Sequence, residues 1–224
     1  MPGQAAGAGS ARPGTFLFAD LAGFTALTEA HGDEHAADVA AAFCDDLRGL
    51  LHGADAVEVK TIGDAMFVHF RDASTAVEFG RQAVVDVGGR HGALAVRVGM
   101  HTGTAVPRGR DWFGATVNTA ARVTALAHPG QVLLTQATYR GLRGVEAVEV
   151  GQRTLRNVRE PVALWALKLP PAGAVARDPV CRMALDTDQP DVLHVELLGR
   201  RVAVCSADCA DVLRAAPGVY LDRR

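Results

Sequence analysis

Hydrophobic and polar positions along the first third of the chain predict one strand, one helix and a hairpin. Residues 15–21 form a short, mostly apolar run, which is typical of a buried strand. Residues 33–51 place apolar side chains three and four positions apart, so we expect a helix with one face packed on a sheet. Residues 55–62 and 65–70 then predict two strands joined by a tight turn.

The pattern continues through the middle of the chain with alternating helices and strands. Residues 72–87 predict a helix, and residues 94–104 predict a long strand with alternating apolar positions. Another helix is expected from about Gly114 to just before residues 128–130, where proline and glycine stop it. Residues 131–169 are expected to form a strand, a short helix and two or three further strands. Because the alternation follows no strict strand-helix-strand order, it favours an α+β fold with a mixed sheet covered by helices.

Composition divides the chain into two globular parts. The 224 residues are enough for one full domain and a small second one. Residues 1–14 are rich in Gly, Ala and Ser and lack the apolar stretch of a secretory signal, so they predict a disordered tail. A Pro-Pro-Ala-Gly sequence predicts a linker over residues 170–177. We therefore expect a main domain over residues 15–169 and a small module over residues 178–224.

Charge and cysteine usage narrow the possible partners and the compartment. A net charge of -2 gives no electrostatic reason to bind nucleic acid or an anionic membrane. No apolar run approaches the roughly 18 residues of a membrane span, so we expect a cytoplasmic protein. Cys44 stands alone, whereas Cys181, Cys205 and Cys209 lie close together in the sequence. In a reducing compartment such a trio indicates metal ligands or redox chemistry more than structural disulfides.

Two aspartates carry the strongest chemical signal. Asp20 and Asp64 each follow an apolar, strand-like run that reaches a glycine, so both carboxylates are expected at the end of a sheet. Taken alone, either aspartate could be an ordinary turn residue. Side by side, the two could hold a pair of divalent cations on a triphosphate. The pattern therefore indicates nucleotide chemistry.

Three motifs occur in a fixed order around these aspartates. They are Phe-Ala-Asp-Leu-Ala-Gly-Phe-Thr at residues 18–25, Lys-Thr-Ile-Gly-Asp at 60–64, and Asp-Trp-Phe-Gly-Ala-Thr-Val-Asn-Thr-Ala-Ala-Arg at 111–122. With them, residues 15–169 resemble the catalytic domain of class III nucleotidyl cyclases. The resemblance implies a ferredoxin-like α+β fold that acts as a homodimer, each active site being shared by two protomers. It also implies that Asp20 and Asp64 bind two Mg²⁺ or Mn²⁺ ions.

The same resemblance implies roles for four further residues. Lys60 and Asp111 would read the adenine base, Lys60 at its N1 acceptor and Asp111 at its exocyclic amine. Asn118 would orient the ribose, and Arg122 would neutralise charge on the reacting phosphate. Asn118 and Arg122 are four apart on a predicted helix, so both point the same way. The implied activity is that of an adenylate cyclase, which converts ATP to 3′,5′-cyclic AMP and pyrophosphate and prefers ATP over GTP.

One position departs from the family pattern, and one rival function stays open. A lysine often found near the end of such domains, where it meets the phosphates, is replaced by Arg156, which keeps the charge. The rival is a catalytically inactive module that binds nucleotide or dimerises. The complete set of metal-binding, base-reading and phosphate-neutralising residues argues against this rival, because decay usually removes one of them.

The C-terminal residues carry a second resemblance. Segments 178–183, 199–209 and 217–221 resemble the YHS domain, a small treble-clef-like module related to the metal-binding TRASH domains. The resemblance implies that Cys181, Cys205 and Cys209 approach one another and could bind Zn²⁺ or another thiophilic metal, with His194 as the nearest candidate for a fourth ligand. A reduced, redox-sensitive trio remains the alternative, and in either case the module could regulate the cyclase domain. His31, at the start of a predicted helix, is expected to be solvated.

Overall fold

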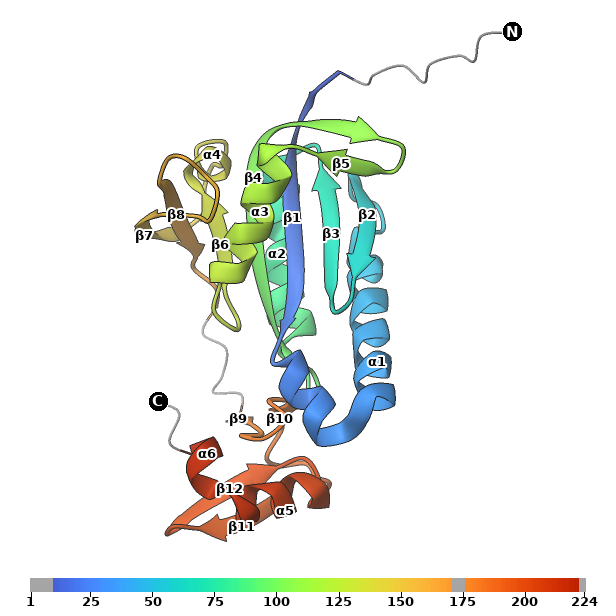
Figure 1. The fold of residues 1–224 in the computed structure, drawn as a ribbon, viewed down its shortest axis with the longest axis vertical. Helices are drawn as coiled ribbons and strands as arrows, with labels where there is room; N and C mark the ends of the chain where they lie inside the picture. Colours follow the sequence, from blue (N-terminus) through green and yellow to red (C-terminus); the bar gives the residue numbers. More distant parts are fainter. Residues whose placement is uncertain (1–9, 171–175, 222–224) are drawn as a thin grey trace, which may run out of the picture.

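The computed structural model describes residues 10–170 and 176–221. Figure 1 shows a large sheet flanked by helices, with a small module below one end of it. The predictions of a tail at residues 1–9 and of a linker at residues 171–175 lie outside the described residues. Within the described part, no helix is both long enough and apolar enough to cross a bilayer.

The N-terminal half folds as a β-α-β-β-α-β unit. Its elements are β1 (Arg12–Ala22), α1 (Phe24–Leu51), β2 (Ala56–Ile62), β3 (Ala65–Phe70), α2 (Ala73–Gln82), the π-helical turn η1 (Ala83–Val87) and β4 (Ala95–Arg108). The four strands lie in the order β2-β3-β1-β4, and every neighbouring pair is antiparallel. This order is the ferredoxin-like arrangement that the sequence analysis predicts.

The second half of the domain extends the same sheet. Its elements are β5 (Asp111–Phe113), α3 (Ala115–Leu126), β6 (Val132–Thr135), α4 (Gln136–Tyr139), β7 (Ala147–Arg153) and β8 (Val162–Leu167). Strand β6 pairs with β4 in parallel, β8 and β7 follow antiparallel, and β5 folds back onto the end of β4. The sheet is therefore mixed, as the alternation of elements predicts.

The two faces of the sheet are covered differently. Alternate residues of β1, such as Leu17 and Ala19, are buried in a large core together with residues of α1 and α2. The intervening Phe16 points to the opposite face, where it joins Phe67 and Ala120 of helix α3. Helix α3 sits close on β4 because Gly99 has no side chain there: a Cβ would lie 2.2 Å from the backbone nitrogen of Thr124. The face under α3 is the one that carries the candidate active-site residues.

Several element boundaries differ from the prediction, and those of β1 and α1 bear on the site. Strand β1 begins at Arg12 rather than at residue 15, because Arg12 already pairs with Ala105 of the long strand β4. Helix α1 begins at Phe24 rather than at residue 33, and its path bends at Gly32, whose backbone adopts φ 82° and ψ 169°. A positive φ is easily reached only by glycine. The predicted helix is therefore the second of two helical segments, and the first one occupies residues 24–31.

The C-terminal module consists of short strands and two helices. Its elements are β9 (Ala176–Arg177), β10 (Ala184–Leu185), β11 (Leu193–Leu197), β12 (Arg200–Val204), α5 (Ala207–Ala215) and α6 (Pro217–Leu221). Strand β9 includes two residues predicted as linker, because they pair with β10. Buried residues of the module, including Val180 and Leu213, belong to the same hydrophobic cluster as the core beneath α1.

Candidate functional site

The two predicted metal-binding aspartates lie on neighbouring strands at one end of the sheet. Asp20 stands near the end of β1, opposite Ala65 of β3, and Asp64 occupies the turn just before it. The backbone N–H of Leu21 donates to the backbone carbonyl of Asp64 at 3.3 Å, which ties the two segments together. Burial and, next to it, the negative charge of Asp20 raise the pKa of Asp64. The structure thus brings the two carboxylates close enough to influence each other electrostatically.

Arg97 is a member of this site that the sequence analysis missed. It lies opposite Asp20 in the β1–β4 register, and its Nε donates to Oδ2 of Asp20 at 2.5 Å. A second guanidinium nitrogen of Arg97 also forms an ion pair with the same carboxylate. The sequence signal that could have revealed Arg97 is its position as a charged residue between two valines of a strand. Both valines are buried, so Arg97 faces away from the core. In this arrangement the guanidinium neutralises Asp20, so a bound cation would have to compete with it.

The two predicted base-reading residues are in direct contact. Nζ of Lys60 on β2 donates to Oδ2 of Asp111 on β5 at 2.5 Å. The backbone N–H of Trp112 donates to the other carboxylate oxygen at 2.8 Å, and the hydrogen bond from Lys60 is the main cause that lowers the pKa of Asp111. The side chains of Lys60 and Asp111 are 44% and 29% exposed, so both remain accessible to a ligand.

Asn118 and Arg122 lie one turn apart on helix α3. Residues on the buried side of this helix, such as Thr119 and Val123, pack on the sheet. Asn118 is exposed and Arg122 half-buried, and a guanidinium nitrogen of Arg122 donates to the backbone carbonyl of Asn118 at 3.2 Å. Within the described residues, no hydrogen bond or ion pair joins these two residues to Asp20 or Asp64. The chain therefore presents three separate groups of candidate residues on the α3 face: the aspartate pair, the Lys60–Asp111 pair, and Asn118 with Arg122.

Exposed apolar side chains surround the base-reading pair. Val57, Ile62 and Phe113 are 59%, 52% and 53% exposed. Val57, Lys60 and Ile62 pair with His69, Phe67 and Ala65 of β3, which are two residues apart and so point to one face. A group of large apolar side chains open to solvent is typical of a protein–protein contact.

Arg156 is not part of any of these groups. It is exposed in the turn between β7 and β8, next to Asn157 with φ 60°. In the described part of the chain, no hydrogen bond or ion pair links it to the other candidate residues. Its predicted contact with phosphate stays a prediction.

The three cysteines of the C-terminal module gather around a histidine of the main domain. The Sγ atoms of Cys181 and Cys205 are 3.5 Å apart, and those of Cys205 and Cys209 are 3.7 Å apart. Nε2 of His31 lies 3.5 Å from Sγ of Cys205 and 3.4 Å from Sγ of Cys209. The expectation that His31 is solvated is therefore wrong. The helical segment before the Gly32 bend, which the sequence pattern did not reveal, places its ring under the module.

His194, the expected fourth ligand, is elsewhere. It is exposed on β11, opposite Ala203, and does not belong to the group of possible ligand atoms formed by His31 and the three thiols.

The thiol of Cys209 is influenced by the two neighbouring thiols. Hydrogen bonds with Cys181 first, and then with Cys205, lower the pKa of Cys209. The cluster is thus suited to hold at least one thiolate.

A buried carboxylate organises the thiol cluster. Asp178 is fully buried, and its Oδ1 accepts the backbone N–H groups of Val180 at 2.7 Å and Cys181 at 3.3 Å. Its Oδ2 accepts the backbone N–H of Cys205 at 2.7 Å, and burial raises the pKa of Asp178. This side chain therefore connects the two segments that carry Cys181 and Cys205. Only tertiary structure could reveal the contact with Cys205, which lies 27 positions away in sequence.

The titration of Asp64 tests the electrostatic coupling within the aspartate pair. In an Asp20→Asn variant, we expect the pKa of Asp64 to fall, because one neighbouring negative charge is gone and Arg97 loses its partner. The pKa should stay above its ordinary value, since burial is the larger cause. NMR of ¹³C-carboxyl-labelled aspartate measures the shift, with Asp111 as an internal control that should not move. A rise in the pKa of Asp64 would contradict the arrangement.

Comparison with known proteins places this geometry in a family. Residues 9–168 match the model of the "Adenylate and Guanylate cyclase catalytic domain". A pH-sensitive adenylate cyclase of Mycobacterium tuberculosis, MT1302, is 34% identical over 167 residues, which cover 70% of this chain and 41% of that protein. A receptor-type adenylate cyclase of Trypanosoma congolense is 32% identical over 206 residues, covering 69% of this chain and 28% of that protein. The chain thus spans less than half the length of these relatives.

Solved structures give the same result for the fold. An adenylate cyclase of Trypanosoma brucei, solved in its monomeric state, superposes with a TM-score of 0.66 at 26% identity, covering 78% of this chain and 95% of that one. The adenylyl cyclase CyaB of P. aeruginosa superposes with a TM-score of 0.62 at 20% identity, covering 72% and 97%. The family match ends at residue 168, so the assignment of the C-terminal module stays a prediction. With three motifs, a mixed sheet and a family match over residues 9–168, the chain belongs to the class III adenylate and guanylate cyclase catalytic domains.

Proposed function

We propose that the protein is an adenylate cyclase that converts ATP to 3′,5′-cyclic AMP and pyrophosphate at sites shared by two protomers. The observation that carries the proposal is that the candidate residues lie on one face of the sheet. Asp20 and Asp64 lie together at one end of the sheet, and the Lys60–Asp111 pair and helix α3 lie on the same face. Each group matches one chemical need of the reaction.

The aspartate pair fits a site for hard divalent cations. Mg²⁺ and Mn²⁺ prefer oxygen ligands, and two carboxylates close enough to raise the pKa of Asp64 are such ligands. Asp20 and Asp64 would hold two ions. To bind them, each carboxylate would give up its present contacts within the protein in favour of the metal. When bound, the ions lower the pKa of the ribose 3′-hydroxyl and hold the triphosphate.

The start of helix α1 supports binding of an anionic triphosphate next to this pair. The helix begins at Phe24, four residues after Asp20, behind Gly23 in a left-handed conformation. Among the described residues, no side chain caps this end and no acidic residue lies in the first turn. The free N–H groups and the positive end of the helix dipole favour phosphate there. The guanidinium of Arg97 adds positive charge beside Asp20.

The remaining residues fit the base, the ribose and the reacting phosphate. An ammonium group next to a carboxylate can donate to N1 of adenine and accept from its exocyclic amine, which is the role proposed for Lys60 and Asp111. Guanine presents a ring N–H and a carbonyl at these positions, so the pair favours ATP. Asn118 would orient the ribose, and Arg122 would stabilise charge on the α-phosphate through its planar set of donors. Arg156 is proposed to contact the phosphates.

The distribution of these residues supports a homodimer. Within one protomer, no hydrogen bond or ion pair among the described residues joins Asn118 or Arg122 to the aspartate pair. The exposed side chains of Val57, Ile62 and Phe113 border the same face. Pairing two such faces would cover the apolar surface and bring the aspartates of one protomer to the helix α3 of the other. The rival, an inactive nucleotide-binding or dimerisation module, leaves the complete set of candidate residues without a purpose.

A direct assay tests the proposed reaction. Purified protein is incubated with Mn²⁺-ATP and, in parallel, with Mn²⁺-GTP, and cyclic nucleotides are measured by chromatography. We expect cyclic AMP in the first reaction. The amount of cyclic GMP formed in the second should be lower by about 10-fold or more, because the base-reading pair matches adenine. Binding of ATP without any cyclic product would favour the inactive module instead.

A further inference from the structure

We propose that His31 of the catalytic domain completes a thiophilic metal site with Cys181, Cys205 and Cys209, so that a bound ion such as Zn²⁺ clamps the C-terminal module onto helix α1. The ligand from the catalytic domain is the new element. It turns a site within the module into a joint between two parts of the chain. Metal binding at this joint does not depend on the proposed cyclase activity.

The spacing of the four ligand atoms matches a tetrahedral ion site. Zinc bonds of about 2.3 Å to sulfur and about 2.0 Å to nitrogen place the ligand atoms of a tetrahedron roughly 3.5–3.8 Å apart. The recorded sulfur–sulfur and sulfur–nitrogen distances run from 3.4 to 3.7 Å. All four atoms lie within 4.8 Å of one another. Three soft thiolates and one imidazole are a donor set that selects zinc over magnesium.

The ligands are held in place by groups that do not themselves bind the ion. Asp178 accepts backbone N–H groups on both thiol-bearing segments, and Ser206 caps helix α5 by accepting the N–H of Cys209 at 3.1 Å. Cys181 and Cys209 are fully buried, and His31 is half-buried. Such support of ligand orientation is typical of structural metal sites. A disulfide between Cys181 and Cys205 is the competing use of these thiols, and it gives no reason for the imidazole to lie against two sulfurs.

The joint is connected to the aspartate pair through short segments of the chain. His31 ends the helical segment that begins four residues after Asp20, immediately before the bend at Gly32. On the other side, Ala184 of β10 exchanges backbone hydrogen bonds with residues 92–93, accepting from the N–H of Gly92 at 2.9 Å and donating to the carbonyl of Ala93 at 2.8 Å. Strand β4, which carries Arg97, begins at residue 95. The module therefore contacts both segments that lead to the Asp20–Arg97 pair.

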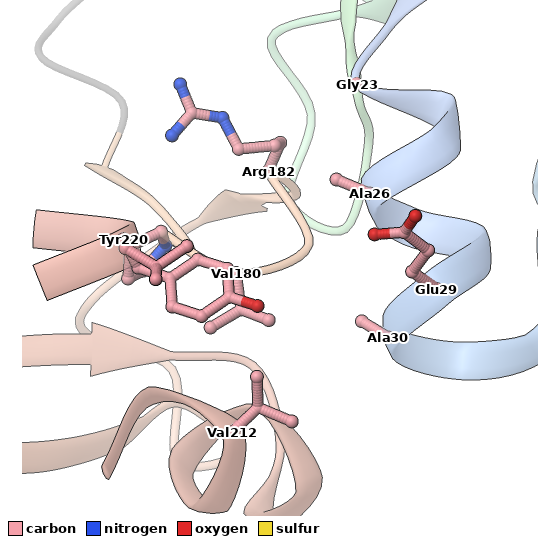
Figure 2. Close-up of a pocket in the computed structure, with 10 residues that line it drawn as sticks. Gly23, Ala26, Glu29, Ala30, Val180, Arg182, Val212 and Tyr220 are labelled. Carbon is pink, nitrogen blue, oxygen red and sulfur yellow. The ribbon is translucent and has the colours of Figure 1, made fainter. Parts of the chain in front are cut away.

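A cavity separates the module from the first segment of α1. Its volume is about 330 Å³, and Figure 2 shows Ala26, Glu29 and Ala30 of the helix facing Val180 and Tyr220 of the module. The contact between the two parts is thus incompletely packed here. The ion would add a bond at His31 to the shared hydrophobic cluster and the backbone hydrogen bonds that already hold the module. Loading or removal of the ion would then shift how firmly the helix beside Asp20 is positioned.

Metal titration of the full, reduced chain tests the proposal. Metal-free protein is titrated with Co²⁺ and then with Zn²⁺ against a chelator, for the wild type and for His31→Ala, His31→Cys, His35→Ala and His194→Ala. We expect the absorption of a tetrahedral Co²⁺–thiolate site in the wild type and an affinity for Zn²⁺ about 100-fold lower or worse in His31→Ala. His31→Cys should regain most of the affinity with a changed Co²⁺ spectrum. His35→Ala and His194→Ala, which alter exposed histidines, should match the wild type.

Hydrogen exchange separates a joint from a site confined to the module. Zinc should slow amide exchange in residues 24–31 of the wild type and leave that segment unchanged in His31→Ala. The proposal is overturned if His31→Ala keeps the affinity and Co²⁺ spectrum of the wild type, or if His194→Ala is the variant that loses them. It is equally overturned if the reduced wild type binds neither ion. None of these results depends on whether the protein makes cyclic AMP.

Discussion

Mixing Asp64→Ala protein with Arg122→Ala protein should restore cyclase activity that neither variant has alone. Each substitution alone should lower kcat by about 100-fold or more, since one removes a metal ligand and the other a stabiliser of transition-state charge. In a symmetric dimer formed at random, about half of the dimers are mixed and each has one intact site of two, so about a quarter of the sites return. The rate of cyclic AMP formation in the mixture measures the recovery.

A second mixture serves as the matched control. Asp20→Ala combined with Asp64→Ala should stay inactive, because both variants damage the same half of the shared site. Formation of mixed dimers is verified with two different affinity tags. Verified mixed dimers of Asp64→Ala and Arg122→Ala that remain inactive would refute the two-protomer site. Recovery in both mixtures would refute it as well.

Exchanging the base-reading pair should change the preferred nucleotide. In a Lys60→Glu/Asp111→Asn variant, the carboxylate can accept the ring N–H of guanine and the amide can donate to its carbonyl, whereas the N1 acceptor of adenine meets a carboxylate that cannot donate to it. The ratio of kcat/KM for GTP to that for ATP should rise by about 1,000-fold, mostly through loss of activity with ATP, because polar groups that a bound base covers but leaves unpaired are costly. Parallel steady-state assays with both nucleotides measure this ratio.

The control for this exchange removes a different surface pair. Lys168→Glu disrupts the exposed contact between Lys168 and Glu146, whose atoms are 3.2 Å apart, and should leave the nucleotide ratio unchanged. The proposed role of Lys60 and Asp111 fails if their double variant still binds nucleotide and keeps the wild-type ratio. Loss of activity with both nucleotides, without loss of folding by circular dichroism, would point to a role in assembly of the dimer instead.

Local patterns were enough to predict most of the fold. The spacing of apolar residues gave the order of strands and helices, and the missing strict alternation of βα units indicated a mixed sheet, which the structure confirms. The helical segment at 24–31 escaped because its start depends on Gly23 in a left-handed conformation and its end on the bend at Gly32. Neither feature produces a helical repeat in the sequence. Tertiary packing of Leu27, which is fully buried, stabilises the segment instead.

The active-site motifs were readable because each is contiguous in the chain. Asp20, Asp64, Lys60 and Asp111 stand in short motifs, and the structure brings them together in two pairs. Arg97 and His31 belong to no such motif. Each acts on partners in distant segments: Arg97 contacts a residue 77 positions away, and His31 contacts a thiol 174 positions away. Spacing along a chain carries no information about such pairs, so only the folded structure reveals them.

The contact between Ala184 and residues 92–93 tolerates mutation because it is made by main-chain groups. The two hydrogen bonds at Ala184 use an amide and a carbonyl, which nearly every residue type supplies. Substitution of the exposed side chains around this contact therefore leaves its two hydrogen bonds possible. For protein engineers, the same property makes the boundary a convenient place to graft a different module onto the catalytic domain.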